Sequence, residues 1–488
     1  MAPKARPVII QGGMGVAVSS WQLAREVSMC GQMGIVSGTA MDAVLARRLQ
    51  TGDEGGHMRR ALAAFPSQEM AQRVLDKYFV EGGKATDAPF KPLPKLTIDT
   101  GRAIQELAVV GNFAEVWCAK EGHDGVVGIN CLEKLQMATP TALLGAALAG
   151  ADYVIMGAGI PRDIPQLLTD IAEGREGKIV ADVAGGSMTR YITVDPAGLL
   201  GEDLPTIERP DFLAIVSADA LANYLYRDES IRPDGFVVEG PSAGGHSAPP
   251  RGKMQLDDAG EPIYGARDIV NLQKMADLSL PFWLAGAYGT PDKLAEALAD
   301  GAAGVQIGTL FALSSDSGLE SATQKQMVEE LRSGDLTVKN DPRASPTGFP
   351  FKVASLQGTQ SETAVYEDRP RLCDLSYLRS AYEKDDGEVG YRCPSEPVHM
   401  YLKKGGTEAA TEGRKCLCNG LMANIGLGQK RKDGYAETRI VTLGQDLVGA
   451  TLLIEKFPQG WTAKEAVTWL TSQISAEQSA PAEAFSIA

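Results

Sequence analysis

One histidine follows a glycine-rich loop at the end of an apolar segment. Residues 235–239 (GFVVE) are typical of a buried strand, and Gly-Pro-Ser-Ala-Gly-Gly-His246 follows directly. Gly244 and Gly245 let the backbone pass close to a flat ligand. An imidazole has an unperturbed pKa of about 6.5, which suits proton transfer near neutral pH. We therefore interpret His246 as a catalytic acid or base; a structural histidine in a turn is the alternative.

Two later apolar segments also end in glycine loops. Residues 284–290 (LAGAYGT) follow one predicted strand, and residues 304–310 (GVQIGTL) form the next strand and its turn. In phosphate-binding barrels, backbone N–H groups after the last two strands surround a phosphate. The residues that permit this approach here, or donate a hydroxyl to it, are Gly286, Gly289, Gly308 and Thr309.

A further glycine loop, residues 11–15 (QGGMG), follows the first apolar segment. Met14 beside these glycines is placed to lie against a flat ring ligand, or equally to pack in the core beside a turn. Asn130 ends the segment GVVGIN, where it can hydrogen-bond the edge of such a ring or serve as a turn residue.

Short apolar segments alternate with helical patterns over about the first 310 residues. Continuous apolar segments followed by helices are typical of parallel strands that are covered on both faces. About eight are present, residues 178–182 (KIVAD) and 212–216 (FLAIV) among them. The pattern predicts an α/β protein with a (β/α)₈ TIM barrel; an open, doubly wound sheet is the alternative.

The pattern changes after about residue 335, where a Pro-rich connection, residues 341–350, precedes a region with fewer strand signals. We predict a barrel over residues 1–335, a smaller C-terminal domain or cap over 336–475, and a flexible tail over 476–488.

Four of the seven cysteines lie in this C-terminal region. Four thiolates can hold Zn²⁺ or an iron–sulfur cluster. The spacings of 20, 23 and 2 residues are long, however, and no CxxC pair is present. We favour reduced cysteines in a small core and predict no metal. The only candidate ligands are Cys373, Cys393, Cys416 and Cys418.

The charge balance excludes some classes of partner. Lys and Arg total 47 and Asp and Glu total 62, for a net charge of −15. This acidity argues against binding to nucleic acid or to anionic membranes. No run of 18 apolar residues occurs, and Gly12 and Gly13 break the first apolar stretch, so we expect neither a membrane span nor a signal peptide. We expect a cytoplasmic protein.

The motifs QGGMG, GIN, AGGH, LAGAYG and VQIGT occur in this order within residues 7–320. This set resembles the nitronate monooxygenase (2-nitropropane dioxygenase) family and the related FMN-dependent enoyl reductases of fatty-acid and polyketide synthesis. The resemblance implies a TIM barrel that holds noncovalent FMN within residues 1–335, with His246 as the catalytic base. The FMN-binding residues predicted from the loops and the resemblance together are Gln11, Gly13, Met14, Asn130, Glu239, Gly244, Gly245, Gly286, Ala287, Gln306, Gly308 and Thr309.

Two positions depart from the nitronate monooxygenase pattern. Many members have a glutamine a few residues before AGGH, where this chain has Glu239. Many also have QAPM in the first loop, where this chain has QGGM, as in the enoyl-reductase branch. Both departures concern the substrate more than the cofactor.

The resemblance implies an FMN-dependent oxidoreductase that oxidises alkyl nitronates with O₂ as the second substrate. The first alternative is an NAD(P)H-dependent enoyl reductase. The second is a flavin- or metal-binding module of a larger assembly. The sequence leaves a homo-oligomer open.

Overall fold

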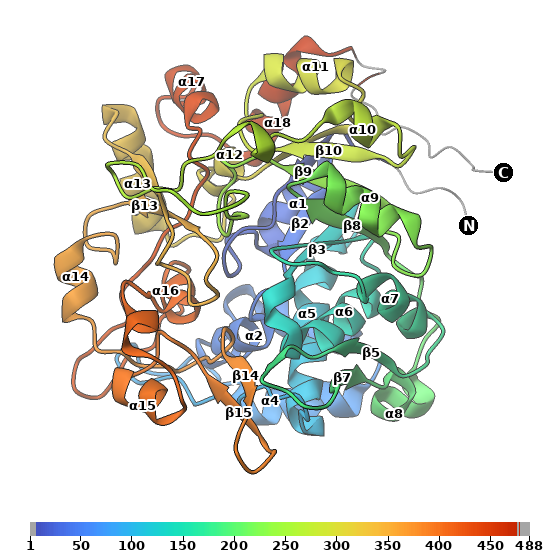
Figure 1. Ribbon diagram of the computed structural model, residues 1–488. Coiled ribbons are helices and arrows are strands. Elements are labelled where there is room, and N and C mark those ends of the chain that lie inside the picture. Colours follow the sequence, from blue (N-terminus) through green and yellow to red (C-terminus); the bar gives the residue numbers. More distant parts are fainter. Residues whose placement is uncertain (1–5, 476–477, 479–488) are drawn as a thin grey trace.

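Eight parallel strands form a closed barrel in the computed structural model, which describes residues 6–475 and Gln478 (Figure 1). The barrel strands are β1 (Ile9–Gln11), β2 (Gly34–Ser37), β3 (Val127–Leu132), β4 (Tyr153–Gly157), β8 (Asp211–Val216), β9 (Gly235–Glu239), β10 (Phe282–Ala285) and β11 (Gly304–Ile307). They are hydrogen-bonded in the order β1-β11-β10-β9-β8-β4-β3-β2. The sheet closes just before β2, where the Gln11 N–H donates to the Met33 carbonyl and the Met33 N–H to the Ile9 carbonyl, both at 3.0 Å. The predicted TIM barrel is confirmed.

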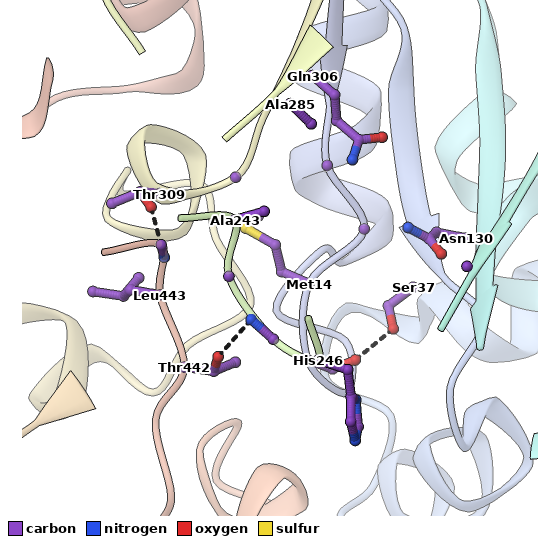
Figure 2. Close-up of a pocket in the computed structure, with 18 of the residues that line it drawn as sticks. Met14, Ser37, Asn130, Ala243, His246, Ala285, Gln306, Thr309, Thr442 and Leu443 are labelled. Atoms are coloured by element: carbon purple, nitrogen blue, oxygen red, sulfur yellow. Dashed lines mark hydrogen bonds between the residues drawn. The ribbon is translucent and has the colours of Figure 1, made fainter. Parts of the chain in front are cut away.

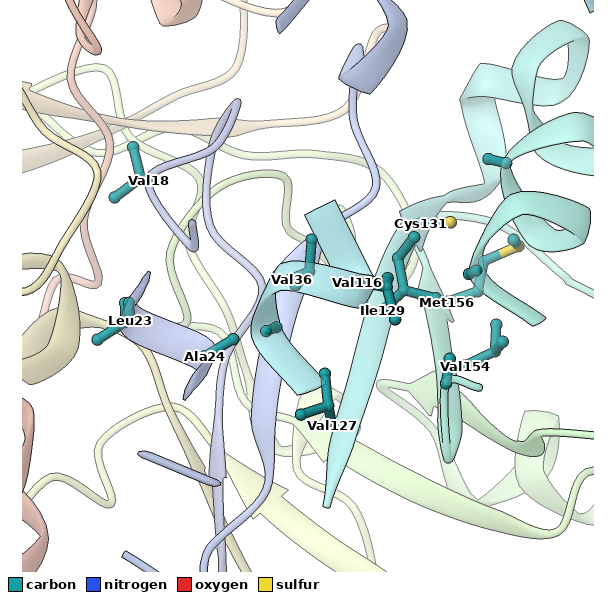
Figure 3. Packing of buried hydrophobic residues seen from close by; sticks show 14 of the residues in the cluster. Val18, Leu23, Ala24, Val36, Val116, Val127, Ile129, Cys131, Val154 and Met156 are labelled. Atoms are coloured by element: carbon teal, nitrogen blue, oxygen red, sulfur yellow. The ribbon is translucent and has the colours of Figure 1, made fainter. Parts of the chain in front are cut away.

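Both faces of these strands are apolar because both are covered. Alternate residues fill the barrel interior, among them Ile10, Ile155 and Trp283. The Trp283 indole N–H donates to the Pro7 carbonyl at 2.9 Å, so this large side chain is satisfied inside the barrel. The residues between them pack outward against the helices, where Figure 3 shows Val36, Val127, Ile129, Val154 and Met156.

Helices surround the barrel between successive strands. α5 packs against α1, α2, α3 and α6 and is buried on most of its circumference. No helix of the described residues has the length and hydrophobicity that a membrane crossing requires. The helices up to β11 are α1 (Trp21–Met29), α2 (Met41–Gln50), α3 (His57–Ala64), α4 (Gln68–Tyr78), α5 (Arg102–Lys120), α6 (Thr139–Leu148), α7 (Ile164–Ala172), α8 (Pro196–Leu200), α9 (Asp219–Arg227), α10 (Leu272–Ala276) and α11 (Pro291–Ala299).

The predicted barrel strand at 178–182 is wrong. β5 (Gly177–Val180) pairs antiparallel with β7 (Tyr191–Val194), outside the barrel. The Lys178 side chain is exposed while Ile179 is buried, so this strand has only one covered face. The fifth barrel strand is β8, which hydrogen-bonds β4 and β9.

The chain beyond β11 packs beside the barrel and partly over its mouth. β12 and β13 form an antiparallel pair, and β14 lies between β15 and β6 (Val183–Ala184). The elements are α12 (Thr309–Ala312), α13 (Ser321–Ser333), β12 (Thr337–Asp341), β13 (Phe351–Ser355), α14 (Thr363–Asp368), β14 (Ser380–Glu383), β15 (Val389–Arg392), α15 (Val398–Lys403), α16 (Leu417–Ala423), α17 (Val448–Lys456) and α18 (Ala463–Leu470).

Two different parts of this C-terminal region meet the barrel. α18 packs on α1, α11 and α12 and so joins the layer of helices around the strands. The part that contains α16 shares a second apolar cluster with α2, to which Met41, Val44, Leu417 and Met422 contribute (Figure 1). The predicted boundary at residue 335 stays a prediction. Apart from Gln478, the predicted tail lies outside the described residues.

Candidate active site

A large cavity opens at the C-terminal ends of the barrel strands (Figure 2). It contains about 1670 Å³ of atom-free space, part of which is open to solvent. A pocket at this end is where α/β barrels bind their ligands, because the βα loops converge there. The predicted site residues that line it are Gly13, Met14, Asn130, Glu239, Gly244, Gly245, His246, Gly286, Ala287, Gln306, Gly308 and Thr309.

Gln11 is the predicted site residue that does not line the cavity. Its side chain is fully buried, and its amide N–H groups donate to the Gly12 carbonyl and to Ser19 Oγ at 2.6 and 2.7 Å. Its Oε1 accepts from the Ile35 N–H at 3.0 Å. Gln11 therefore holds the first glycine loop against the neighbouring strand.

The loop after β1 approaches β3 and β11 closely. A Cβ on Gly13 would lie 2.2 Å from Asn130 Cβ, so only glycine allows this contact. A Cβ on Gly308 would lie 3.4 Å from the Met14 sulfur. Near these residues, Gln306 Oε1 is buried without a hydrogen-bond partner. Buried acceptors in proteins are nearly always hydrogen-bonded, so a ligand that donates a hydrogen bond to Gln306 Oε1 would account for its missing partner.

The loop after β10 adopts a backbone conformation that few residues tolerate. Gly286 and Ala287 have φ values of +86° and +62°, in the left-handed region. Such strain in a non-glycine residue is concentrated at functional sites. Thr309 Oγ1 accepts a hydrogen bond from the Gly444 N–H at 3.0 Å, so residues beyond the barrel complete this end of the cavity.

His246 lies at the other end of the cavity, across from Gln306 and Asn130 in Figure 2. Its backbone forms an antiparallel bridge with Phe351, and the two rings meet edge to face with their centroids 4.9 Å apart. His246 Nε2 is 2.7 Å from Ser345 Oγ, which is itself 2.8 Å from Thr347 Oγ1. Burial lowers the pKa of His246 to about 4, so its ring is neutral at pH 7.

A second titratable pair lies beside this site. Burial raises the pKa of Glu239 to about 7, and the nearby Lys352 ammonium opposes that rise. Burial also lowers the pKa of Lys352 to about 8. Lys352 Nζ donates to Ser247 Oγ at 2.9 Å, which fixes it behind the loop that carries His246.

The C-terminal region supplies wall residues that the sequence motifs did not indicate. Thr442 Oγ1 accepts from the Gly245 N–H at 3.0 Å, and so fixes the glycine before the histidine. The other wall residues from this region are Phe351, Tyr377, Leu378, Leu417, Cys418, Leu421, Leu443, Gly444, Asp446, Gly449 and Ala450. Only Cys418 carried a sequence signal, as a candidate metal ligand.

The fold and the cavity together define an α/β-barrel enzyme with a deep, glycine-lined pocket. Residues 207–342 match the family model described as nitronate monooxygenase. This segment contains β9, the His246 loop, β10 and β11. The match confirms the predicted resemblance: the protein is an oxidoreductase that resembles nitronate monooxygenases. No curated protein sequence matches the chain significantly.

Several solved structures align over most of the chain. FabK from Thermotoga maritima is 16% identical with a TM-score of 0.46, covering 96% of this chain and 92% of that one. Nitroalkane oxidase from Streptomyces ansochromogenes is 15% identical with a TM-score of 0.42, covering 97% of each chain. The enoyl reductase domain of MlnA, from the macrolactin biosynthesis cluster of Bacillus amyloliquefaciens, is 12% identical with a TM-score of 0.39, covering 74% and 66%.

Proposed function

We propose that the protein is an FMN-dependent oxidoreductase that oxidises alkyl nitronates with O₂ and uses His246 as its base. The observation that carries the proposal is one cavity with a buried, unpaired amide acceptor, Gln306 Oε1, toward one end and a neutral imidazole at the other. The match of residues 207–342 to the nitronate monooxygenase model supports it.

The residues present fit FMN. Its ring system offers an imide N–H, which suits the orphaned acceptor of Gln306, and carbonyl oxygens, which suit the Asn130 amide. Gly12 and Gly13, the latter close to Asn130, leave the first part of the loop after β1 without side chains that would obstruct a flat ring. Backbone N–H groups near Gly286 and the Thr309 hydroxyl would hold the phosphate.

When bound, FMN would accept electrons from the substrate and pass them to O₂. The protein's own contribution is binding, orientation and proton transfer. The neutral ring of His246 would take the α-proton of a neutral nitroalkane and so supply the nitronate, and Ser345 would fix the orientation of that ring through Nε2. Phe351, Leu378 and Leu417 form an apolar wall that excludes water from this end.

The His246→Asn variant tests the base. We expect it to retain FMN and to lose about 10²- to 10⁴-fold of its turnover with neutral nitroalkanes, whose α-proton must be removed, because that is the usual contribution of a positioned base. His399→Asn is the matched control, because His399 is exposed on α15 and does not line the cavity. Unchanged turnover in His246→Asn would refute the assigned role.

Anaerobic mixing tests the substrate. Rapid bleaching of the flavin by an alkyl nitronate supports the proposal. Bleaching by NADPH alone would replace it with an enoyl reductase, the branch that shares the QGGM loop at residues 11–14. A colourless protein that does not bind added FMN would overturn the cofactor and the function together.

A further inference from the structure

The four cysteines of the C-terminal region line one small cavity, although they come from four separate positions in the chain. Two follow the Pro-rich connection in loops before β14 and after β15, and two lie at the start of α16. The cavity has about 270 Å³ of atom-free space, part of which is open to solvent. Its cysteines are Cys373, Cys393, Cys416 and Cys418, none of which forms a disulfide.

The thiols lie near enough to interact with one another. Burial is the main cause that raises the pKa of Cys393 to about 12, and Cys418 adds to the rise. Burial likewise raises the pKa of Cys418 to about 11, with a further contribution from Cys373. The shared cavity, which all four cysteines line, is the geometric evidence that the thiols lie together.

An arginine provides charge compensation. Arg379 also lines the cavity, and burial lowers the pKa of its guanidinium. Its N–H groups donate to the Ser376 and Leu96 carbonyls, and no carboxylate of the described residues lies within ion-pair distance of it. Glu396, the carboxylate that lines the same cavity, is bound by Lys404 at 2.6 Å. Arg379 is partly buried, and its guanidinium also lies over the Tyr391 ring, 4.9 Å from the ring centroid. A partly buried cation without an ion-pair partner among the described residues suits an anionic occupant.

A single metal ion does not suit this arrangement. A tetrahedral Zn²⁺ with Zn–S distances of about 2.3 Å needs its four thiolates within about 4 Å of one another. Among the described residues, no group of three or more His, Cys, Asp or Glu side chains is arranged to hold one ion. An iron–sulfur cluster separates its thiolates by iron and sulfide, so it fits four cysteines that line one cavity without being arranged around a single ion.

We propose that Cys373, Cys393, Cys416 and Cys418 bind an iron–sulfur cluster of the four-iron type. The cluster adjoins the candidate active site, because Leu378, Leu417 and Cys418 line both cavities. It ties α16 to the loops on either side of β14 and β15, and thereby holds one wall of the active-site cavity in place.

Metal and sulfide analysis of the full-length protein, purified without oxygen, tests the proposal. We expect about four iron and four acid-labile sulfide per chain, and broad visible absorption beneath the flavin bands. Protein purified in air is first treated with Fe²⁺ and sulfide under reducing conditions. Stoichiometric zinc without sulfide, or no bound metal after this treatment, would overturn the proposal.

Substitutions locate the ligands. Cys393→Ser and Cys416→Ser should lose iron and sulfide, whereas Cys30→Ser, which removes a thiol at the end of α1, should retain both. If the two buried variants are insoluble, Cys373→Ser gives the same test at a less buried ligand. Full iron content in a soluble Cys373→Ser and in a soluble Cys416→Ser would overturn the ligand assignment.

Discussion

Because the amide oxygen of Gln306 is unpaired, we predict that replacing Gln306 stabilises the FMN-free protein and weakens the binding of FMN. Gln306 lies in β11, its Oε1 is buried, and no described residue donates to it. Gln306→Met removes this acceptor and keeps a side chain of similar length. The change separates two free energies that most substitutions combine. One is the cost of leaving Gln306 Oε1 unpaired when the site is empty, and the other is the gain from its hydrogen bond to bound FMN.

The expected magnitudes follow from this geometry. Leaving a buried acceptor unpaired costs about 1–3 kcal/mol, so Gln306→Met should raise the free energy of unfolding of FMN-free protein by up to that amount. A hydrogen bond to FMN contributes about 0.5–1.5 kcal/mol. Its loss should therefore raise the Kd for FMN by about 2- to 12-fold.

Urea denaturation of FMN-free protein and titration with FMN, followed by flavin fluorescence, measure the two effects. Gln360→Met is the matched control, because Gln360 Oε1 is also buried and unpaired but lies outside the cavity. Its Kd for FMN should not change. A Gln306→Met protein that is less stable without FMN and binds FMN as tightly as the parent would refute the reasoning.

Two further predictions concern buried charges. Arg369 and Glu437 form an ion pair with side chains 4% and 0% exposed. Arg369→Met should lower the free energy of unfolding by about 3–5 kcal/mol, because it leaves the buried carboxylate of Glu437 without its partner. Urea unfolding measures this loss, and the double variant Arg369→Met/Glu437→Leu should regain stability if the unpaired carboxylate is the cause. Burial raises the pKa of Glu239 from 4.5 to about 7, so the folded FMN-free chain keeps a proton that the unfolded chain releases, and the free energy of unfolding should fall as the pH rises through that range. Glu239→Gln should remove this dependence in urea midpoints measured from pH 4.5 to 8, and an identical slope in both proteins would contradict it.

The barrel could be predicted because its strands are apolar on both faces, as GFVVE in β9 is. The same signal failed at residues 178–182, because a run of a few apolar residues does not show whether one face or both are covered. α5 was not predicted as an element. It is buried around most of its surface, so it has no amphipathic pattern to detect. It also lies very close to α2, because a Cβ on Gly111 would be 2.7 Å from the Met41 carbonyl oxygen.

The residues of the candidate site also fall into those that the sequence predicts and those that it does not. Gln306, near the C-terminal end of a strand, and His246, in the loop after one, could be predicted because these positions fix which end of the barrel they reach. Thr442 and Gly444 could not, since they reach the cavity through long-range contacts with Gly245 and Thr309. The convergence of the four cysteines also depends on tertiary packing, which their spacing of 20, 23 and 2 residues does not reveal.

The hydrogen bond from Gly444 to Thr309 joins residues 135 positions apart. All eight barrel strands are therefore synthesised well before the last piece of the pocket leaves the ribosome. A chain that ended between these points would have all eight strands but an incomplete candidate pocket. Completion of that pocket depends on the segment around residues 442–450.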